Sequence, residues 1–138
     1  MNDEKIKHLE FIQNIITRMN TNSFQIKGMT ITIVSALLAV YASEKEPTFI
    51  LISIFPLILF WFLDAYYLTQ ERKFRGLYND ILKGNKSELK PFEMRPDLYN
   101  KGKYSFFSVL FSKTIWTLYL IVAFVLTLVY FYLTYKQT

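Results

Sequence analysis

Asp64 is the residue most able to do chemistry, because it places a carboxylate inside the apolar and aromatic run 60–68. An ionised carboxylate in such surroundings costs about 3 kcal/mol on membrane-insertion scales, so it should face other protein groups and have a partner. Arg18 and Lys27 are candidate partners from the same chain, and Arg75 is a candidate from a neighbouring copy. Asp64 is then a buried polar clamp, a group that controls ion passage, or a shallow carboxylate at a membrane interface.

Polar residues recur on both sides of Asp64 at helical spacing. One stripe comprises Asp64, Tyr67, Glu71, Arg75 and Tyr78, and a second comprises Arg18, Asn22 and Gln25. Residues three and four positions apart share a helix face, so Glu71 and Arg75 are also spaced for an ion pair, worth about 0.3–0.5 kcal/mol when exposed. The stripes predict a shared polar layer, which either holds a helical hairpin together or lines the vestibule of an oligomer. The candidate site residues are Arg18, Asn22, Lys27, Asp64, Tyr67, Glu71 and Arg75.

Other reaction chemistries have little basis in the sequence. The chain has no cysteine and a single histidine, His8, so disulfides and the usual zinc sites are excluded, and His8 is expected on a helix surface. The four glycines are too dispersed for a phosphate-binding loop. Hydroxyl residues of the apolar segments lack a nearby base that would activate a nucleophile. We therefore expect no enzyme activity, no cofactor and no metal ion.

The elements that must position Asp64 are three apolar segments with almost no charge, at residues 26–43, 48–68 and 114–132. A helix needs about 20 predominantly apolar residues to cross the ~30 Å hydrocarbon core of a bilayer, and each segment approaches this length. The fold class is therefore an all-α integral membrane protein with three transmembrane helices. At 138 residues the chain has room for a single membrane domain, residues 1–138.

The connecting segments have distinct patterns. Residues 3–24 repeat apolar side chains at helical spacing and predict an amphipathic helix, which together with the first span could form one helix with a bend at Gly28 or in the run 20–23. A polar turn at 44–47 makes the first two spans a hairpin, and Pro56 should kink its second helix. Residues 69–113 predict a helical extension that stops at Gly84–Ser87, then a basic loop with an interfacial aromatic stretch at 104–111.

The basic residues give an orientation. Fourteen of the sixteen Lys and Arg residues lie in the N-terminal segment or in the loop at 69–113. By the positive-inside rule these regions are cytoplasmic and the C-terminus is outside. The same rule accounts for the net charge of +5, so no direct nucleic-acid partner is expected. The basic loop has alternatives beyond topology, since it could bind acidic lipid headgroups, a nucleotide or a cytoplasmic protein.

Two motif blocks stand out in the sequence: RMxxNSFxxKG, from Arg18 to Gly28, and FWxLDAYYLxxERxFRxLY, from Phe60 to Tyr78. Together they resemble a family of small, poorly characterised bacterial inner-membrane proteins. This resemblance covers most of residues 8–82 and implies a location in the bacterial inner (plasma) membrane, without implying an activity or a site role. In general architecture the chain also resembles membrane effectors and accessory proteins of anti-phage systems.

Two functions are consistent with these patterns. The first is an oligomeric membrane protein that forms a channel-like or membrane-permeabilising assembly, as an anti-phage (antiviral defence) effector would. Three spans enclose little volume, so a polar pathway requires a homo-oligomer. The alternative is a membrane anchor or adaptor that recruits a cytoplasmic partner through residues 3–24 and 70–113.

Overall fold

The computed structural model describes residues 2–84 and 92–138, and all regular secondary structure within them is helical. The elements are α1 (Asp3–Glu44), α2 (Thr48–Lys83), the 3₁₀ turns η1 (Pro96–Leu98) and η2 (Gly102–Tyr104), α3 (Phe106–Leu110) and α4 (Lys113–Gln137). Part of the predicted basic loop, with Lys86, Lys90 and most of the predicted helix stop Gly84–Ser87, lies outside the described residues.

The predicted amphipathic helix and the first span form one element, because α1 runs for 42 residues without interruption at 20–23 or at Gly28. At about 1.5 Å per residue its length is about 63 Å, roughly twice the hydrocarbon thickness of a bilayer. Asn2 begins the helix by accepting a hydrogen bond from the Lys5 backbone N–H at 2.8 Å. Lys45 ends it in a left-handed conformation, with φ of 58°.

The second helix, α2, extends from Thr48 to Lys83 and continues through Pro56 as a single helix. It ends where the sequence predicts, at Gly84, whose φ of 71° is a conformation that glycine adopts without steric cost. The short helix α3 lies within the predicted interfacial stretch 104–111. The predicted third span is contained in α4, which begins at Lys113 and ends at Gln137.

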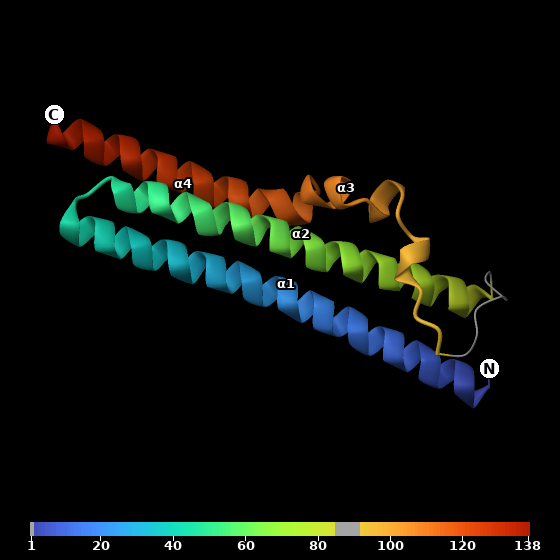
Figure 1. Cartoon of the computed structure of the whole chain (residues 1–138). Coiled ribbons are helices and arrows are strands. Elements are labelled where there is room, and N and C mark those ends of the chain that lie inside the picture. The colour runs from blue at the N-terminus through green and yellow to red at the C-terminus, as the bar shows by residue number, and fades with distance from the viewer. Residues whose placement is uncertain (1, 85–91) are drawn as a thin grey trace.

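The helices form a long antiparallel pair with a shorter third member (Figure 1). The third helix, α4, lies along the half of α2 that is nearest the turn between α1 and α2, so the C-terminus and this turn are at the same end. The N-terminus is at the opposite end, where the segment from Phe92 to Tyr104 lies beside the other half of α2. Three helices, α1, α2 and α4, are thus placed side by side, and all three are long and apolar enough to cross a membrane.

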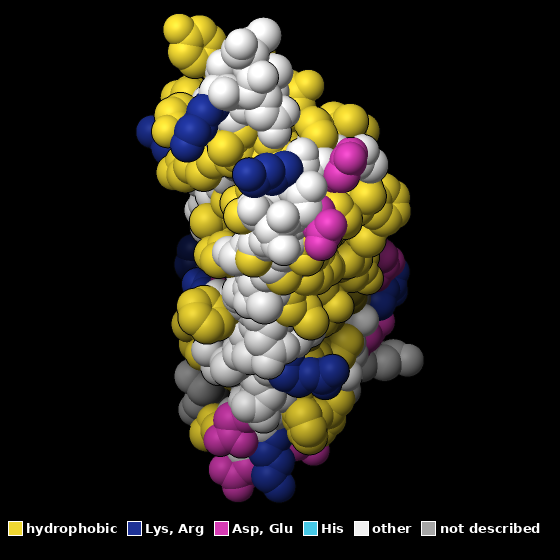
Figure 2. Space-filling view, turned by 90° about the vertical axis from the view of Figure 1, so that its left-hand side faces the viewer, with side chains coloured by type: hydrophobic (Ala, Val, Ile, Leu, Met, Phe, Trp, Pro, Cys, Tyr) yellow, Lys and Arg dark blue, Asp and Glu magenta, His cyan; other side chains and the backbone are white. Residues whose placement is uncertain are grey.

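Most of the apolar helix surface is not covered by the rest of the chain. In the 18-residue apolar windows of α1, α2 and α4, the buried shares are only 22%, 28% and 17%. Figure 2 views the end that carries the α1–α2 turn, where hydrophobic side chains cover much of the visible surface. A helix that is apolar all round requires apolar surroundings on every side, which is consistent with a multi-pass membrane protein.

Two hydrophobic cores divide the long hairpin. The first core joins α1, α2, α3 and α4 and contains Val34, Leu57, Ala65, Val109, Leu110, Ile115, Tyr119 and Leu126. The second core joins the N-terminal half of α1, the C-terminal half of α2 and the segment after Phe92, and contains Leu9, Ile12, Ile16, Phe74, Leu77, Ile81 and Tyr99. The predicted amphipathic stripe of residues 3–24 therefore packs on the protein's own α2.

Candidate functional site: a buried polar cluster

Asp64 lies where the three long helices meet, and its side chain has 0% exposure. From α1, the Ser23 hydroxyl donates a hydrogen bond to Asp64 Oδ1, and Lys27 Nζ lies 2.5 Å from Asp64 Oδ2. From α4, the Tyr119 hydroxyl donates to the same Oδ2 at 3.0 Å. We call Ser23, Lys27, Asp64 and Tyr119 the buried polar cluster.

The local sequence of α1 explains how two of these side chains reach one carboxylate. Ser23 and Lys27 are four residues apart and therefore share a helix face. Lys27 Nζ also donates to Ser23 Oγ at 2.9 Å, so the two side chains support each other as well as Asp64. Both carboxylate oxygens have donors, as a charge in apolar surroundings requires.

The cluster identifies one of the three candidate partners of Asp64. Lys27 is the partner, whereas Arg75 pairs with Glu71 on its own helix, with 2.7 Å between Arg75 Nη2 and Glu71 Oε1. This i,i+4 pair was anticipated from its spacing, but Glu71 is buried whereas Arg75 is exposed. Arg18 is exposed and takes no part in the buried polar cluster.

The predicted layer of two polar stripes does not form as a unit. Asn22 and Tyr67 are half-buried and Gln25 is exposed, so the stripe of Arg18, Asn22 and Gln25 faces away from Asp64. The Tyr67 ring contacts its neighbour Tyr66, with centroids 5.6 Å apart. The polar layer instead uses the adjacent face of α1, which carries Ser23 and Lys27.

Two members of the cluster were not predicted from the sequence as site residues. Ser23 could have been found, since it lies one helical turn before Lys27 and belongs to the NSF part of the first motif block. The two motif blocks meet at this point, because Ser23 and Lys27 come from one and Asp64 from the other. Tyr119 had no such signal, because its position depends on how α4 aligns with α2.

The second core contains its own polar contacts. The expectation that His8 lies on the helix surface is wrong, since His8 is only 4% exposed and its Nε2 lies 3.1 Å from the Glu93 carbonyl oxygen. The residues after Phe92 cover this face of α1, which periodicity alone could not reveal. Tyr99 donates a hydrogen bond to Asp80, and burial, followed by this bond, raises the pKa of Tyr99 above its usual value.

The chemistry available to the buried polar cluster is narrow. It has one carboxylate, one amine and two hydroxyls, which can hold or separate charge but do not form a nucleophile–base pair with an open face. Within residues 2–84 and 92–138, acidic and histidine side chains do not gather into a group that could hold a metal ion. The cluster is therefore suited to joining helices or controlling a polar path.

Comparisons with protein-family models, curated proteins and solved structures gave no match.

Proposed function

We propose that the chain is a three-span protein of the bacterial inner membrane, with its N-terminus in the cytoplasm and its C-terminus outside. Copies associate into a homo-oligomer that acts as a channel-like, membrane-permeabilising assembly. In this orientation the first core lies in the bilayer and the second core in the cytoplasm. A kink of α2 at Pro56 within the bilayer is part of the same proposal.

One observation carries the proposal of self-association. On the side of α1 away from α2 and α4, the predicted span exposes a strip of small or hydroxyl-bearing residues, flanked by the bulky exposed side chains of Met29, Ile31, Ile33 and Val40. The strip comprises Gly28, Thr32, Ser35, Ala36, Ala39 and Ser43. Small residues let helices approach closely within a membrane, where close packing drives association. The contrast with α4 supports a packing role, since the exposed positions of α4 are mostly bulky, as Phe124 and Leu128 illustrate.

The same α1 face supports a polar path. Thr32 and Ser35 carry hydroxyls on this exposed face, and the Thr32 hydroxyl donates to the Gly28 carbonyl at 2.9 Å. The Lys27 side chain is 23% exposed. Lys27 is thus partly exposed while it pairs with the buried Asp64. In the proposed assembly the Lys27–Asp64 pair is the closed state, and release of Lys27 toward the path opens it. Buried ion pairs often add little net stability, which favours a switching role for this one.

Cross-linking tests the assembly directly. The natural sequence has no cysteine, so a single introduced cysteine reports on one position. We expect Thr32→Cys to give disulfide-linked dimers in membranes. Leu59→Cys is the matched control, because it is exposed and lies at a similar distance from the α1–α2 turn, but on α2. Equal cross-linking at both positions, or at neither, would contradict an α1-mediated assembly.

Permeabilisation is tested with a membrane-potential dye during inducible expression. We expect the wild type to depolarise cells and Asp64→Asn to change the extent of depolarisation. Lys136→Gln, at an exposed position near the end of α4, is the control and should behave as wild type. An unchanged potential with both the wild type and Asp64→Asn would argue strongly against a channel. For an anti-phage effector, depolarisation should appear on phage infection at natural expression levels.

A second function, a membrane anchor or adaptor, is favoured by a different observation. The second core holds α1, α2 and the segment 92–104 in a compact unit that carries exposed charges at the N-terminal end. Such a unit could recruit a cytoplasmic protein or bind a nucleotide. Pull-down from detergent separates the two functions, since a stoichiometric soluble partner supports the adaptor and symmetric self-assembly supports the channel.

A further inference from the structure

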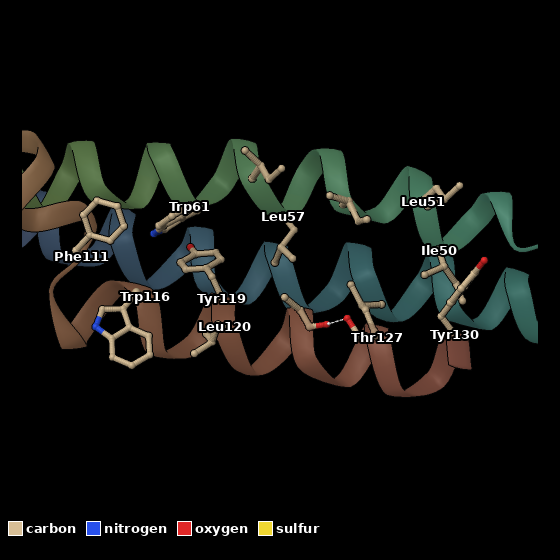
Figure 3. Close-up of a pocket in the computed structure, with 14 residues that line it drawn as sticks. Ile50, Leu51, Leu57, Trp61, Phe111, Trp116, Tyr119, Leu120, Thr127 and Tyr130 are labelled. Carbon is tan, nitrogen blue, oxygen red and sulfur yellow. Dashed lines mark hydrogen bonds between the residues drawn. The ribbon is translucent and has the colours of Figure 1, made fainter. Parts of the chain in front are cut away.

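An apolar groove runs between α2 and α4 on the face shown in Figure 3. Its volume is about 680 Å³, within the range of about 300–1,000 Å³ that is usual for small-molecule sites. The lining includes Leu57 and Trp61 from α2 and Trp116, Ala123 and Tyr130 from α4, with Phe111 at the end nearest α3. No charged residue lines it, and its one threonine, Thr127, donates its hydroxyl hydrogen to the Ala123 carbonyl at 2.8 Å.

The dimensions of the groove suit a hydrocarbon chain. On α4 it extends from Trp116 to Tyr130, which at ~1.5 Å per residue is about 21 Å. One leaflet of a bilayer contributes about 15 Å of hydrocarbon, so a single acyl chain could lie along the groove and reach past the midplane. The groove is partly open to the surroundings of the protein, so a chain can enter from the side.

The end of the groove nearest α3 carries positive charge. Lys113, exposed at the first position of α4, is two residues from the groove-lining Phe111. The first N–H groups of α4 point to the same end, and the N-terminus of a 25-residue helix attracts phosphate. Next to them, the Ser112 hydroxyl oxygen is the one buried side-chain N or O atom without a hydrogen-bond partner in residues 2–84 and 92–138.

Further cations lie beyond this end. Arg72 Nη1 donates to the backbone carbonyl of Lys103 at 3.1 Å, and Lys103 Nζ lies 5.3 Å from the centroid of the Tyr104 ring. Arg72 is eleven residues, or three helical turns, after the groove-lining Trp61 and so lies on the same face of α2. Asp64 and Glu71, the acids of α2 in this region, are already paired with Lys27 and Arg75. The positive charge at this end is therefore not neutralised by α2.

Aromatic side chains mark the level at which a headgroup would sit. Trp61 Nε1 donates to the Leu110 carbonyl at 3.2 Å and holds α3 against α2. Phe107 on α3 and Phe111 directly after it remain 70% and 65% exposed. Tryptophan and exposed phenylalanine beside basic residues are typical of a segment at the membrane–water interface.

We infer that the α2–α4 groove binds an anionic phospholipid of the cytoplasmic leaflet. One acyl chain lies along the groove, and the phosphate rests at the N-terminus of α4 beside Lys113, with Lys103 and Arg72 as outer cations. This inference rests on the proposed membrane insertion. It does not rest on the proposed assembly, which uses the exposed small-residue face of α1 and not the groove between α2 and α4.

The test is native mass spectrometry of the full chain after reconstitution in vesicles of phosphatidylglycerol or of phosphatidylcholine. We expect the wild type to retain phosphatidylglycerol preferentially. Lys113→Gln should weaken retention about fivefold, as loss of one cation near an anionic headgroup implies. Ala123→Phe, which fills the groove, should reduce retention of either lipid at least tenfold. Leu128→Phe is the control, since Leu128 is exposed on α4 but outside the groove, and it should match the wild type.

Other outcomes would overturn the inference. Equal retention of the two lipids by the wild type would show that charge does not select the lipid. Full retention by Ala123→Phe would show that the lipid does not bind in the groove. Disulfide-linked dimers of Ala123→Cys would show that a second copy of the chain occupies the groove instead. Purification without detergent as a monodisperse species would refute membrane insertion itself, which is distinguishable from a membrane protein that retains no lipid.

Discussion

The carboxylate of Asp64 is fully buried, so the loss of Lys27 leaves an uncompensated charge among three helices. Removal of one partner from a buried ion pair typically costs about 3–5 kcal/mol, and the partial exposure of Lys27 places Lys27→Met near the lower figure. The double variant Lys27→Met/Asp64→Leu should recover much of this loss, because no charge is then buried. Thermal unfolding in detergent measures both. A double variant less stable than either single variant would contradict this account.

Gly76 is a second residue whose identity has a direct steric reason. A Cβ at this position would lie 2.7 Å from Tyr104 Oη and 3.1 Å from Tyr99 Cδ1. Gly76→Ala should therefore displace the segment 92–104 from α2 and destabilise the second core by about 1–3 kcal/mol, a usual cost of overpacking.

Limited proteolysis measures the effect of Gly76→Ala as faster cleavage within the segment 92–104. Gly28→Ala is the matched control, since an added Cβ there has nothing within 4 Å, and alanine is favoured over glycine inside a helix. Equal cleavage rates for the two variants would show that Tyr99 and Tyr104 can move away from the added methyl group without destabilising the second core.

At the scale of elements, the packing of the segment 92–104 on α2 depends on the protonation of Tyr99. The folded state favours neutral Tyr99, since burial and the bond to Asp80 raise its pKa above the unfolded value near 10. The folded state thus binds more protons than the unfolded state above about pH 10, so the stability of this packing falls as pH rises further. Proteolysis followed from about pH 8 to about pH 11 should show the wild-type segment loosening at the alkaline end. Tyr99→Phe should abolish this pH step.

The long elements and their ends could be predicted from the sequence, but the continuity of α1 could not. Apolar length and charge located α1, α2 and α4, and Gly84 located the end of α2 because a left-handed residue is needed there. The continuity of α1 was left open, since the polar run 20–23 has low helix propensity that tertiary packing overrides.

For the buried polar cluster, the need of Asp64 for a partner could be predicted from the sequence, but the identity of that partner could not. The burial cost of Asp64 required a partner, and Lys27 was among the candidates. The choice between Lys27 and Arg18 depends on the rotation of α1 about its axis, and the contribution of Tyr119 depends on the register of α4. Both are tertiary properties that the spacing of residues within one helix does not contain.

At the scale of the whole molecule, the positions of the termini make a testable statement about topology. The N-terminus and the C-terminus lie at opposite ends of the three-helix arrangement (Figure 1), as an odd number of spans requires. With the basic loop inside, a reporter fused after Thr138 should be active only outside the cytoplasm, and one inserted after Gly84 only inside. A cytoplasmic signal from the Thr138 fusion would mean that the orientation is reversed or that α4 does not cross the membrane.

The Tyr119–Asp64 hydrogen bond also bears on the order of biosynthesis, because it joins the middle of the sequence to its last helix. If the chain is inserted in a membrane as proposed, a nascent chain that contains α1 and α2 but not α4 holds a carboxylate with two of its three donor groups. It also lacks Ile115, Tyr119 and Leu126 from the first core. Such a hairpin exposes an incompletely satisfied polar group, which membrane proteases can recognise. In pulse-chase labelling, a chain truncated after Leu110 should disappear faster than the full chain, and equal lifetimes would count against this. Completion of α4 would then distinguish full-length chains from incomplete ones by their lifetime.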